Sequence, residues 1–244
     1  MMRRRSPWHA DGVSSTGDPL LGGASIAAGE RVFGDDAAWF ALGALSGPYL
    51  PWGSGAMRPA GLVVVCNDIV LNDRGRIVEL GSGISTVLLA RLLRQLSATG
   101  ERRLAAVEHD GGWGGWVVGQ LAREGVGDQV MVIDAPLRTQ TAADGGWTWY
   151  DVAAVDAGLD AAMGGDVIDL LVVDGPPAFA VGLALARHPA LPVLWDRLAP
   201  GATVVLDDVE RPGEQEVLRR WEAEFGLVFR REERNAGVAI ASVP

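Results

Sequence analysis

Short apolar runs alternate with longer segments of helical periodicity from residue 76 onward. The short runs are apolar almost throughout, which is typical of parallel strands buried on both faces. The longer segments repeat apolar residues every three or four positions, as amphipathic helices do. We expect strands at Arg76–Leu80, Leu104–Glu108, Val130–Ile133, Ile168–Val173 and Thr203–Leu206, and helices at about 85–97, 112–124, 151–163, 178–198 and 212–225.

The two ends of the chain follow other patterns. Residues 1–32 mix Arg, Gly, Ser and Pro without apolar periodicity, so we expect a flexible N-terminal tail there. Helical patterns at Asp35–Leu45 and about 57–71, separated by a Gly- and Pro-rich break, predict an N-terminal helical cap over residues 33–72. Apolar runs at 227–230 and 238–241 flank a charged turn and predict a C-terminal antiparallel hairpin.

The alternation of strands and helices predicts the fold class. Strand and helix in regular succession are typical of α/β proteins, in which helices cover both faces of a parallel sheet. We therefore expect residues 73–244 to form one domain, a doubly wound and mostly parallel sheet that closes with the C-terminal hairpin.

Composition and charge narrow the classes of function. The chain has 21 basic and 31 acidic residues and a net charge of -10 at pH 7, which does not attract nucleic acid or an anionic membrane. No apolar run reaches the roughly 18 residues of a membrane-spanning helix. A single cysteine, Cys66, and the absence of an apolar signal-peptide core after Arg5 favour a cytoplasmic location.

A Gly-rich turn between the first predicted strand and helix is the first candidate ligand site. Gly81-Ser82-Gly83 follows the apolar strand, and Glu108 ends the second strand about 25 residues later. This order suits a nucleoside whose ribose hydroxyls are held by the acid. Thr86 stands where a dinucleotide-binding motif has its third glycine, and Glu79 would repel phosphate, so a nucleoside with a positive centre fits better. Alternatively, Glu79 braces the backbone of the loop.

These motifs together resemble the class I S-adenosylmethionine-dependent methyltransferases. The resemblance covers roughly residues 60–244 and rests on Glu79-Leu80-Gly81-Ser82-Gly83, Glu108, Ile133-Asp134-Ala135, Leu170 to Pro177, and Leu198 to Asp208 in the family's order. It implies a Rossmann-like methyltransferase fold with seven strands and S-adenosyl-L-methionine as cofactor. The cofactor-binding residues that it implies are Glu79, Gly81, Ser82, Gly83, Ser85, Thr86, Glu108, His109, Asp134, Ala135 and Asp174. For His109, a solvated loop position is the alternative.

Two departures from the family pattern indicate the acceptor. Ser85 stands where many members carry another glycine, which resembles small-molecule methyltransferases of bacteria. The sequence after Asp174 lacks the Asn-Pro-Pro-Tyr type motif of enzymes that methylate amino groups of nucleic acids. The resemblance therefore implies O-methylation of a small molecule or sugar. We expect the chain to bind this small-molecule acceptor, and not nucleic acid or a membrane.

Three acids follow neighbouring predicted strands. Asp174 ends the fourth strand, and Asp207 and Asp208 end the fifth, so their carboxylates should meet over the transferred methyl group. Such a cluster resembles metal-dependent O-methyltransferases and could hold Mg²⁺ through Asp174, Asp207 and Asp208. Without metal, Asp174, Asp207 or His188 is the candidate catalytic base. Asp208 could instead cap the helix that starts near residue 211.

The tryptophans leave two interpretations. Trp147 and Trp149 share a face of an extended segment and could form an acceptor-binding wall or simply pack. Trp113 and Trp116 are spaced to share a helix face that covers the sheet.

The leading prediction is a methyltransferase, and two alternatives of other classes remain. One is a non-catalytic module that keeps the cofactor-binding fold. The other is a nicotinamide-dependent oxidoreductase, which Thr86 and the absence of lysine for a Tyr-x-x-x-Lys pair count against. The sequence leaves open the identity of the acceptor, the metal requirement and whether the chain forms a homo-oligomer.

Overall fold

The computed structural model describes residues 34–96, 101–140, 147–231 and 237–244, which belong to one compact unit spanning Val32 to Pro244. The predicted tail over residues 1–32 lies outside the described residues. No helix in the described part of the chain is both long enough and apolar enough to span a bilayer.

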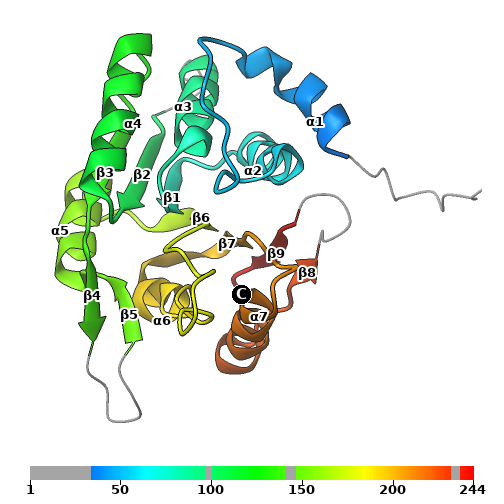
Figure 1. The fold of residues 1–244 in the computed structure, drawn as a ribbon, viewed down its shortest axis with the longest axis vertical. Coiled ribbons are helices and arrows are strands. Elements are labelled where there is room, and N and C mark those ends of the chain that lie inside the picture. Colours follow the sequence, from blue (N-terminus) through cyan, green and yellow to red (C-terminus); the bar gives the residue numbers. More distant parts are fainter. Residues whose placement is uncertain (1–33, 97–100, 141–146, 232–236) are drawn as a thin grey trace, which may run out of the picture. The chain divides into compact units, whose positions relative to one another are not determined.

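A seven-stranded sheet forms the centre of the fold, in the order β3-β2-β1-β6-β7-β9-β8 (Figure 1). β3, β2, β1, β6 and β7 are parallel, whereas β9 runs antiparallel to both β7 and β8. The predicted doubly wound sheet with a closing antiparallel hairpin is confirmed. The strands are β1 Arg76–Leu80, β2 Arg103–Glu108, β3 Val130–Asp134, β6 Ile168–Val173, β7 Leu198–Leu206, β8 Arg230–Arg231 and β9 Ala239–Ser242.

Helices cover both faces of the sheet, because successive strand side chains point to opposite faces. Ile77 packs into a core with α1 to α4, whereas its neighbour Val78 packs into a second core with α5 to α7. In Figure 1, α1 to α4 lie together in the upper half. The helices are α1 Asp35–Leu42, α2 Pro59–Leu71, α3 Ile84–Leu96, α4 Gly111–Glu124, α5 Val152–Met163, α6 Ala190–Leu194 and α7 Pro212–Phe225, with 3-10 turns at Gly43–Leu45 and Trp195–Arg197.

Local sequence sets where the helices that border the site begin and end. Asp110 caps α4, since its carboxylate accepts from the backbone N–H groups of Gly112 at 2.9 Å and Trp113 at 3.0 Å. Gly125 ends the same helix with φ of 61°, a left-handed conformation that glycine adopts without steric cost. α4 is thereby held with its N-terminus directly after β2.

The helix predicted over 178–198 is wrong for most of its length. The segment 174–179 is an irregular loop, successive turns follow from Ala180, and the helix begins only at Ala190. Gly182 adopts φ of 86°, and Pro189 lacks the backbone N–H that a helix interior needs, so a continuous helix through both positions is disfavoured.

A two-stranded antiparallel hairpin, β4 Leu137–Gln140 with β5 Trp147–Tyr150, was not predicted. It continues the chain from β3 (Figure 1). Trp149 is fully buried and packs edge-on against Trp147, with ring centroids 6.3 Å apart. This favours the packing interpretation of the two tryptophans over an acceptor-binding wall.

Candidate active site

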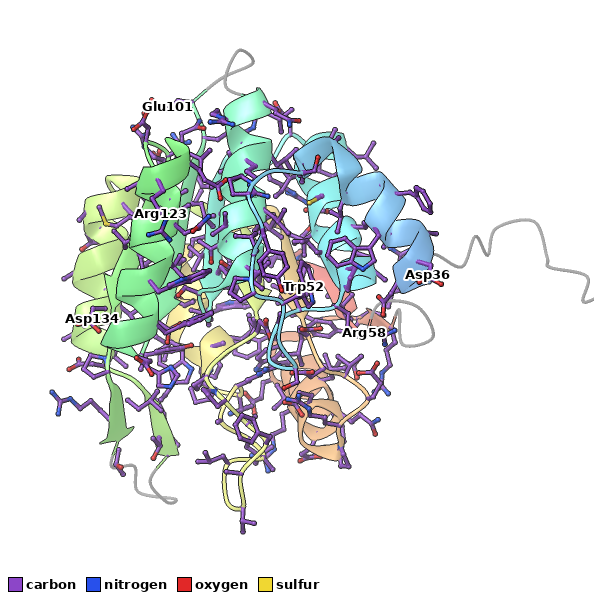
Figure 2. All side chains as sticks on the ribbon, turned by 45° about the horizontal axis from the view of Figure 1, so that its top comes forward. Asp36, Trp52, Arg58, Glu101, Arg123 and Asp134 are labelled. Atoms are coloured by element: carbon purple, nitrogen blue, oxygen red, sulfur yellow. The ribbon has the colours of Figure 1, made fainter. Side chains whose placement is uncertain are left out.

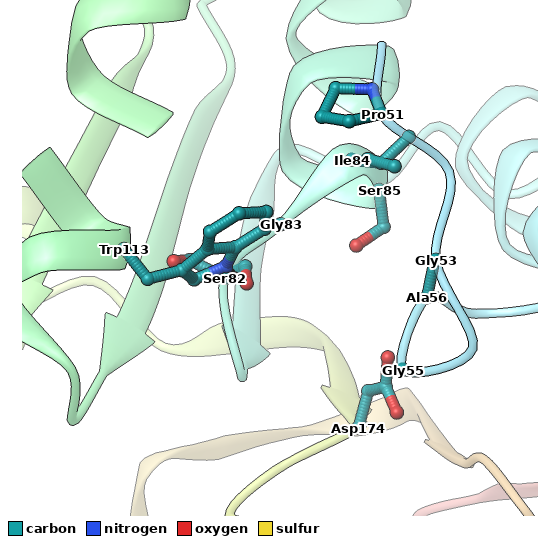
Figure 3. Close-up of a pocket in the computed structure, with 10 residues that line it drawn as sticks. All are labelled: Pro51, Gly53, Gly55, Ala56, Ser82, Gly83, Ile84, Ser85, Trp113 and Asp174. Atoms are coloured by element: carbon teal, nitrogen blue, oxygen red, sulfur yellow. Dashed lines mark hydrogen bonds between the residues drawn. The ribbon is translucent and has the colours of Figure 1, made fainter. Parts of the chain in front are cut away.

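The carboxyl ends of β1, β2, β6 and β7 lie along one edge of the sheet. Strand order reverses between β1 and β6, and open α/β sheets bind ligands at such a point. A cavity of about 290 Å³ lies there (Figure 3), lined by Pro51, Gly53, Gly55, Ala56, Ser82, Gly83, Ile84, Ser85, Trp113 and Asp174. A second cavity of about 250 Å³ shares Gly55, Ser82, Trp113 and Asp174 and is also lined by Gly81, Glu108, His109, Asp110, Tyr150, Gly175, Pro177, Phe179, Arg187, Asp208 and Arg211.

The Gly-rich turn packs directly on the loop that follows β6. Gly81 has φ of 94°, and a side chain there would place Cβ 3.1 Å from the backbone nitrogen of Gly175. A Cβ on Gly175 would lie 2.9 Å from Cα of Gly81 and 2.3 Å from the hydroxyl of Tyr150. Both positions therefore require glycine, and the two loops meet without intervening side chains.

Glu79 is fully buried beneath this turn. The Thr86 hydroxyl donates to Glu79 Oε2 at 2.5 Å, and the backbone N–H of Gly83 donates to Thr86 Oγ1 at 2.8 Å. Glu79 therefore braces the loop, as the alternative interpretation held, while its Oε1 has no hydrogen-bond partner among the described residues. Burial raises the pKa of Glu79 to about 7, and the charge of Glu108 adds to this while hydrogen bonds from Ser85 and Thr86 oppose it.

Glu108 is buried at the end of β2 and accepts four hydrogen bonds. Its Oε2 accepts from the backbone N–H of Ser82 at 3.1 Å and from the Ser82 hydroxyl at 2.9 Å. Its Oε1 accepts from the backbone N–H groups of His109 and Asp110, each at 2.8 Å, and contacts His109 Nδ1 at 2.9 Å. The carboxylate is thus firmly oriented, and Ser82 Oγ and His109 Nδ1 are its side-chain partners.

Two aromatic side chains complete the cavity walls. Trp113 donates from Nε1 to the carbonyl of Ser82 at 2.8 Å and stacks on Trp116 at 4.8 Å between centroids. The sequence predicts that Trp113 only covers the sheet, but in the structure Trp113 lines both cavities. Tyr150 lines the second cavity, and its buried hydroxyl has no hydrogen-bond partner among the described residues.

Asp134 and Ala135 lie apart from these walls. Asp134 is exposed at the end of β3, away from the loop that carries Trp52 (Figure 2). Ala135 is buried and donates its backbone N–H to the carbonyl of Glu108 at 2.7 Å. Neither residue lines either cavity, so their adenine-side role stays a prediction.

The three acids predicted to converge do so. Asp174, Asp207 and Asp208 each offer a carboxylate oxygen within 4.8 Å of the others. Burial, together with the charge of Asp208 and of Glu79, raises the pKa of Asp174 to about 7, although Arg187 opposes the shift. Burial and the charges of Asp174 and Asp208 raise the pKa of Asp207 well above its usual range.

A buried arginine lies within this cluster and was missed from the sequence. Arg187 Nη2 donates to the carbonyl of Asp174 at 2.7 Å and to Asp208 Oδ2 at 2.9 Å, and it lies 3.3 Å from Asp174 Oδ1. Nη1 donates to the carbonyl of Asp207 at 3.0 Å. The prolines around Arg187 indicate a connection at the mouth of the sheet, but nothing in the sequence points to Arg187 as the partner of the acids.

The structure also gives the positions of His188 and Asp208, for which the sequence suggested roles as a base and as a helix cap. His188 Nε2 lies 3.2 Å from Glu224 Oε1 on α7, and His188 lines neither cavity, which does not favour a role as base. Asp208 does not cap α7, because the N-cap position is Arg211 and has no side-chain cap bond. Asp208 instead adopts φ of 62° and forms an ion pair with Arg211 at 2.7 Å.

Comparison with known proteins agrees with this geometry. A protein-family model described as a methyltransferase domain matches residues 78–209, more than half of the chain. No curated protein matches the sequence significantly.

Solved structures of similar fold share little sequence with the chain. An O-methyltransferase from Bacillus cereus in complex with S-adenosylhomocysteine is 17% identical, with a TM-score of 0.54 over 86% of this chain and 90% of that chain. A protein of Staphylococcus aureus assigned as a caffeoyl-CoA O-methyltransferase is 15% identical, with a TM-score of 0.55 over 80% of this chain and 86% of that chain. A methyltransferase of Podospora anserina bound to S-adenosylhomocysteine is 16% identical, with a TM-score of 0.52 over 78% of this chain and 80% of that chain.

These likenesses establish the fold, and the family match establishes membership. The chain belongs to the methyltransferase-domain family and is a class I S-adenosylmethionine-dependent methyltransferase.

Proposed function

We propose that the chain transfers the methyl group of S-adenosylmethionine to a hydroxyl oxygen of a small-molecule acceptor, with Asp174 as the base. The position of Asp174 carries this proposal, because it lines both cavities. Ser85 and Gly83 line only the first cavity, whereas Pro177 and Phe179 line only the second. The first cavity then takes the methionine end of the cofactor, and the second, which Glu108 also lines, takes the ribose and extends to the acceptor.

Buried polar atoms without partners fit the cofactor. Glu79 Oε1 is an acceptor beneath the Gly-rich turn, and the Tyr150 hydroxyl is a donor beside Gly175; neither has a hydrogen-bond partner among the described residues. Leaving such groups unsatisfied is costly, so a polar ligand would stabilise them. When bound, S-adenosylmethionine supplies a methyl group on a positively charged sulfur, whose leaving group is a neutral thioether.

Glu108 is the residue that would hold the ribose. Its bonds to the backbone N–H groups of Ser82, His109 and Asp110 keep the carboxylate in place. The Ser82 hydroxyl and the His109 ring would yield their places on Glu108, because both can turn away without moving the backbone. The turn from Ser82 to Thr86 would then lie along the cofactor. Thr86 fixes this turn, because its hydroxyl bonds to both Gly83 and Glu79.

The second cavity favours an acceptor with an apolar face. Phe179 is 78% exposed at the rim of this cavity, next to Pro177, and Tyr150 lines it. An exposed aromatic ring beside a polar site is typical of small-molecule recognition. Two of the proteins with similar solved structures are named as O-methyltransferases, which supports oxygen as the methylated atom. The net charge of -10 argues against nucleic acid.

The sequence also predicts assistance by a divalent cation, which this proposal does not include. Carboxylate oxygens are the ligands that Mg²⁺ prefers, and three of them meet at this edge. However, Arg187 already donates to Asp174 and Asp208. The carboxylates as arranged therefore do not fit a metal ion together with Arg187. In the proposed reaction Asp174 accepts the hydroxyl proton, and the acceptor oxygen bonds to the methyl carbon as the carbon–sulfur bond breaks, so the neutral thioether S-adenosylhomocysteine leaves.

The test is methyl transfer from isotope-labelled S-adenosylmethionine to a panel of phenols, alcohols and sugars, with nucleic acid and protein as comparison acceptors. We expect labelled product with a small hydroxyl compound, and a rate that falls as the pH drops below about 7, where Asp174 becomes protonated. Asp174→Asn should lower kcat by roughly 100-fold or more while S-adenosylhomocysteine still binds.

A second variant separates the acceptor side from the chemistry. Phe179→Ala should raise the KM for the acceptor and leave the affinity for S-adenosylhomocysteine unchanged, because Phe179 is exposed at the rim of the second cavity, whereas the ribose-holding Glu108 is buried within it. Transfer of label only to nucleic acid or protein would overturn the assignment of the acceptor.

A further inference from the structure

Arg187 connects the ends of the two strands that carry the acid cluster. Its side chain is only 4% exposed. Each guanidinium nitrogen faces an acceptor: Nε the carbonyl of Pro176 at 3.5 Å, Nη1 the carbonyl of Asp207 at 3.0 Å, and Nη2 the carbonyl of Asp174 at 2.7 Å. The guanidinium is therefore held in one orientation by backbone atoms of the β6 and β7 loops.

The same guanidinium is the buried positive charge of the cluster. Arg187 Nη2 contacts Asp174 Oδ1 and Asp208 Oδ2, and Nη1 lies 3.7 Å from Glu214 Oε1. A second arginine, Arg211, pairs with Asp208 at 2.7 Å but is 37% exposed. Carboxylates this close and this buried repel one another unless a cation or shared protons compensate them.

Arg187 and a divalent cation would compete for the same oxygens. Mg²⁺ needs oxygen ligands at about 2.1 Å in near-octahedral geometry, directed at one centre. One oxygen of Asp174 and one of Asp208 are already directed at Nη2. A guanidinium fixed beside these oxygens would also repel an incoming cation.

We propose that the Arg187 guanidinium takes the place of a divalent cation in this site: it neutralises and orients Asp174 and Asp208, so the folded chain excludes metal from the cluster. The inference rests on the proposed function, since it makes Arg187 the positioning residue for the base. Arg187 also lines the second cavity and lies outside the sequence motifs.

Metal binding without any cofactor or acceptor tests this proposal. Mn²⁺, a paramagnetic substitute for Mg²⁺, is titrated into wild-type chain and Arg187→Ala, and bound metal is measured by electron paramagnetic resonance. Wild type should show no specific Mn²⁺ site, and its melting temperature should not change with EDTA or Mg²⁺. Arg187→Ala should gain a single Mn²⁺ site, which the further change Asp208→Asn removes.

Arg91 provides the matched control. It is equally buried, pairs with Glu124 at 2.7 Å and donates to the carbonyls of Leu45 and Pro48, but it lies away from the strand ends. Arg91→Ala should lose stability without gaining a Mn²⁺ site, which separates metal exclusion from general loosening. Arg187→Lys should keep metal out, because it retains the positive charge.

A specific Mn²⁺ site in wild type, abolished by Asp174→Asn, would overturn the proposal. So would Arg187→Ala that folds and gains no site. If Arg187→Ala does not fold, the Mn²⁺ titrations of wild type and Asp174→Asn still test the proposal. The proposal requires that neither protein binds Mn²⁺ at a specific site. Since no arm involves S-adenosylmethionine, failure here is distinct from failure of the proposed methyl transfer.

Discussion

Glu79 is the clearest case of a single residue whose environment has a measurable consequence. Its carboxyl group is fully buried, one oxygen is bonded to Thr86, and the other has no partner among the described residues. Burial raises its pKa from 4.5 to about 7. Between about pH 4.5 and 7, the cofactor-free folded protein therefore retains a proton on Glu79 that the unfolded chain has already released.

Glu79→Gln tests this shift through stability. Between pH 4.5 and 7 the folded state binds more protons at Glu79 than the unfolded state does, so this residue lowers the free energy of unfolding as pH rises. The shift corresponds to about 3 kcal/mol at most. Urea unfolding from pH 4.5 to 7.5, without cofactor, should show the variant gaining stability relative to wild type across that window. Parallel stability profiles would contradict the assignment.

The acids of the site were predictable because strand ends meet. Glu79, Glu108, Asp174 and Asp207 each lie in or directly after an apolar run, and parallel strands bring such positions to one edge. Arg187 and Tyr150 were not predictable in this way. Both come from segments whose conformation depends on tertiary packing, so spacing in the sequence did not reveal their neighbours.

At the scale of elements, prediction succeeded where hydrophobic periodicity was strong. The five parallel strands and the helices α3, α4, α5 and α7 lie where the pattern placed them. It failed over residues 178–189, where the chain forms a loop and successive turns before α6 begins at Ala190. It also failed for β4 and β5, whose pairing joins Leu137 to Tyr150 and depends on burial of Trp149 and Tyr150 beneath the site.

The N-terminus of α4 links element stability to cofactor binding. Asp110 caps this helix and so places Trp113, which donates to the carbonyl of Ser82 in the Gly-rich turn. Asp110→Ala should cost about 1 kcal/mol of unfolding free energy. It should also weaken binding of S-adenosylhomocysteine, measured by calorimetry, because Trp113 loses its fixed position.

Two variants control this prediction. Asp110→Asn keeps an acceptor at the cap and should preserve both stability and affinity. Asp151→Ala removes the corresponding cap of α5, where Asp151 accepts from Ala153 and Ala154, but Asp151 lines neither cavity. It should therefore lose stability without losing affinity. Equal losses of affinity in Asp110→Ala and Asp151→Ala would contradict the proposed role of Trp113.

At the scale of the whole molecule, the N-terminal helices and the sheet act together. α1 and α2 share a core with α3, and the loop between α1 and α2 brings Pro51, Gly53 and Gly55 over the Gly-rich turn (Figure 3). The predicted cap over residues 33–72 thus contributes directly to the candidate cofactor cavity. The loop after β6 supplies Asp174 to the first cavity, and the cap segment supplies Pro51, Gly53 and Gly55 to the wall of the same cavity.

The most direct test of the central claim is a calorimetric titration of the full chain with S-adenosylhomocysteine and, separately, with NAD. We predict binding of S-adenosylhomocysteine alone, unaffected by EDTA, and at least a tenfold (roughly 1.4 kcal/mol) loss of affinity in Glu108→Ala. At 100 times its dissociation constant the ligand should also stabilise the fold by about 2.7 kcal/mol. Binding of NAD instead, or of neither ligand, would contradict the account.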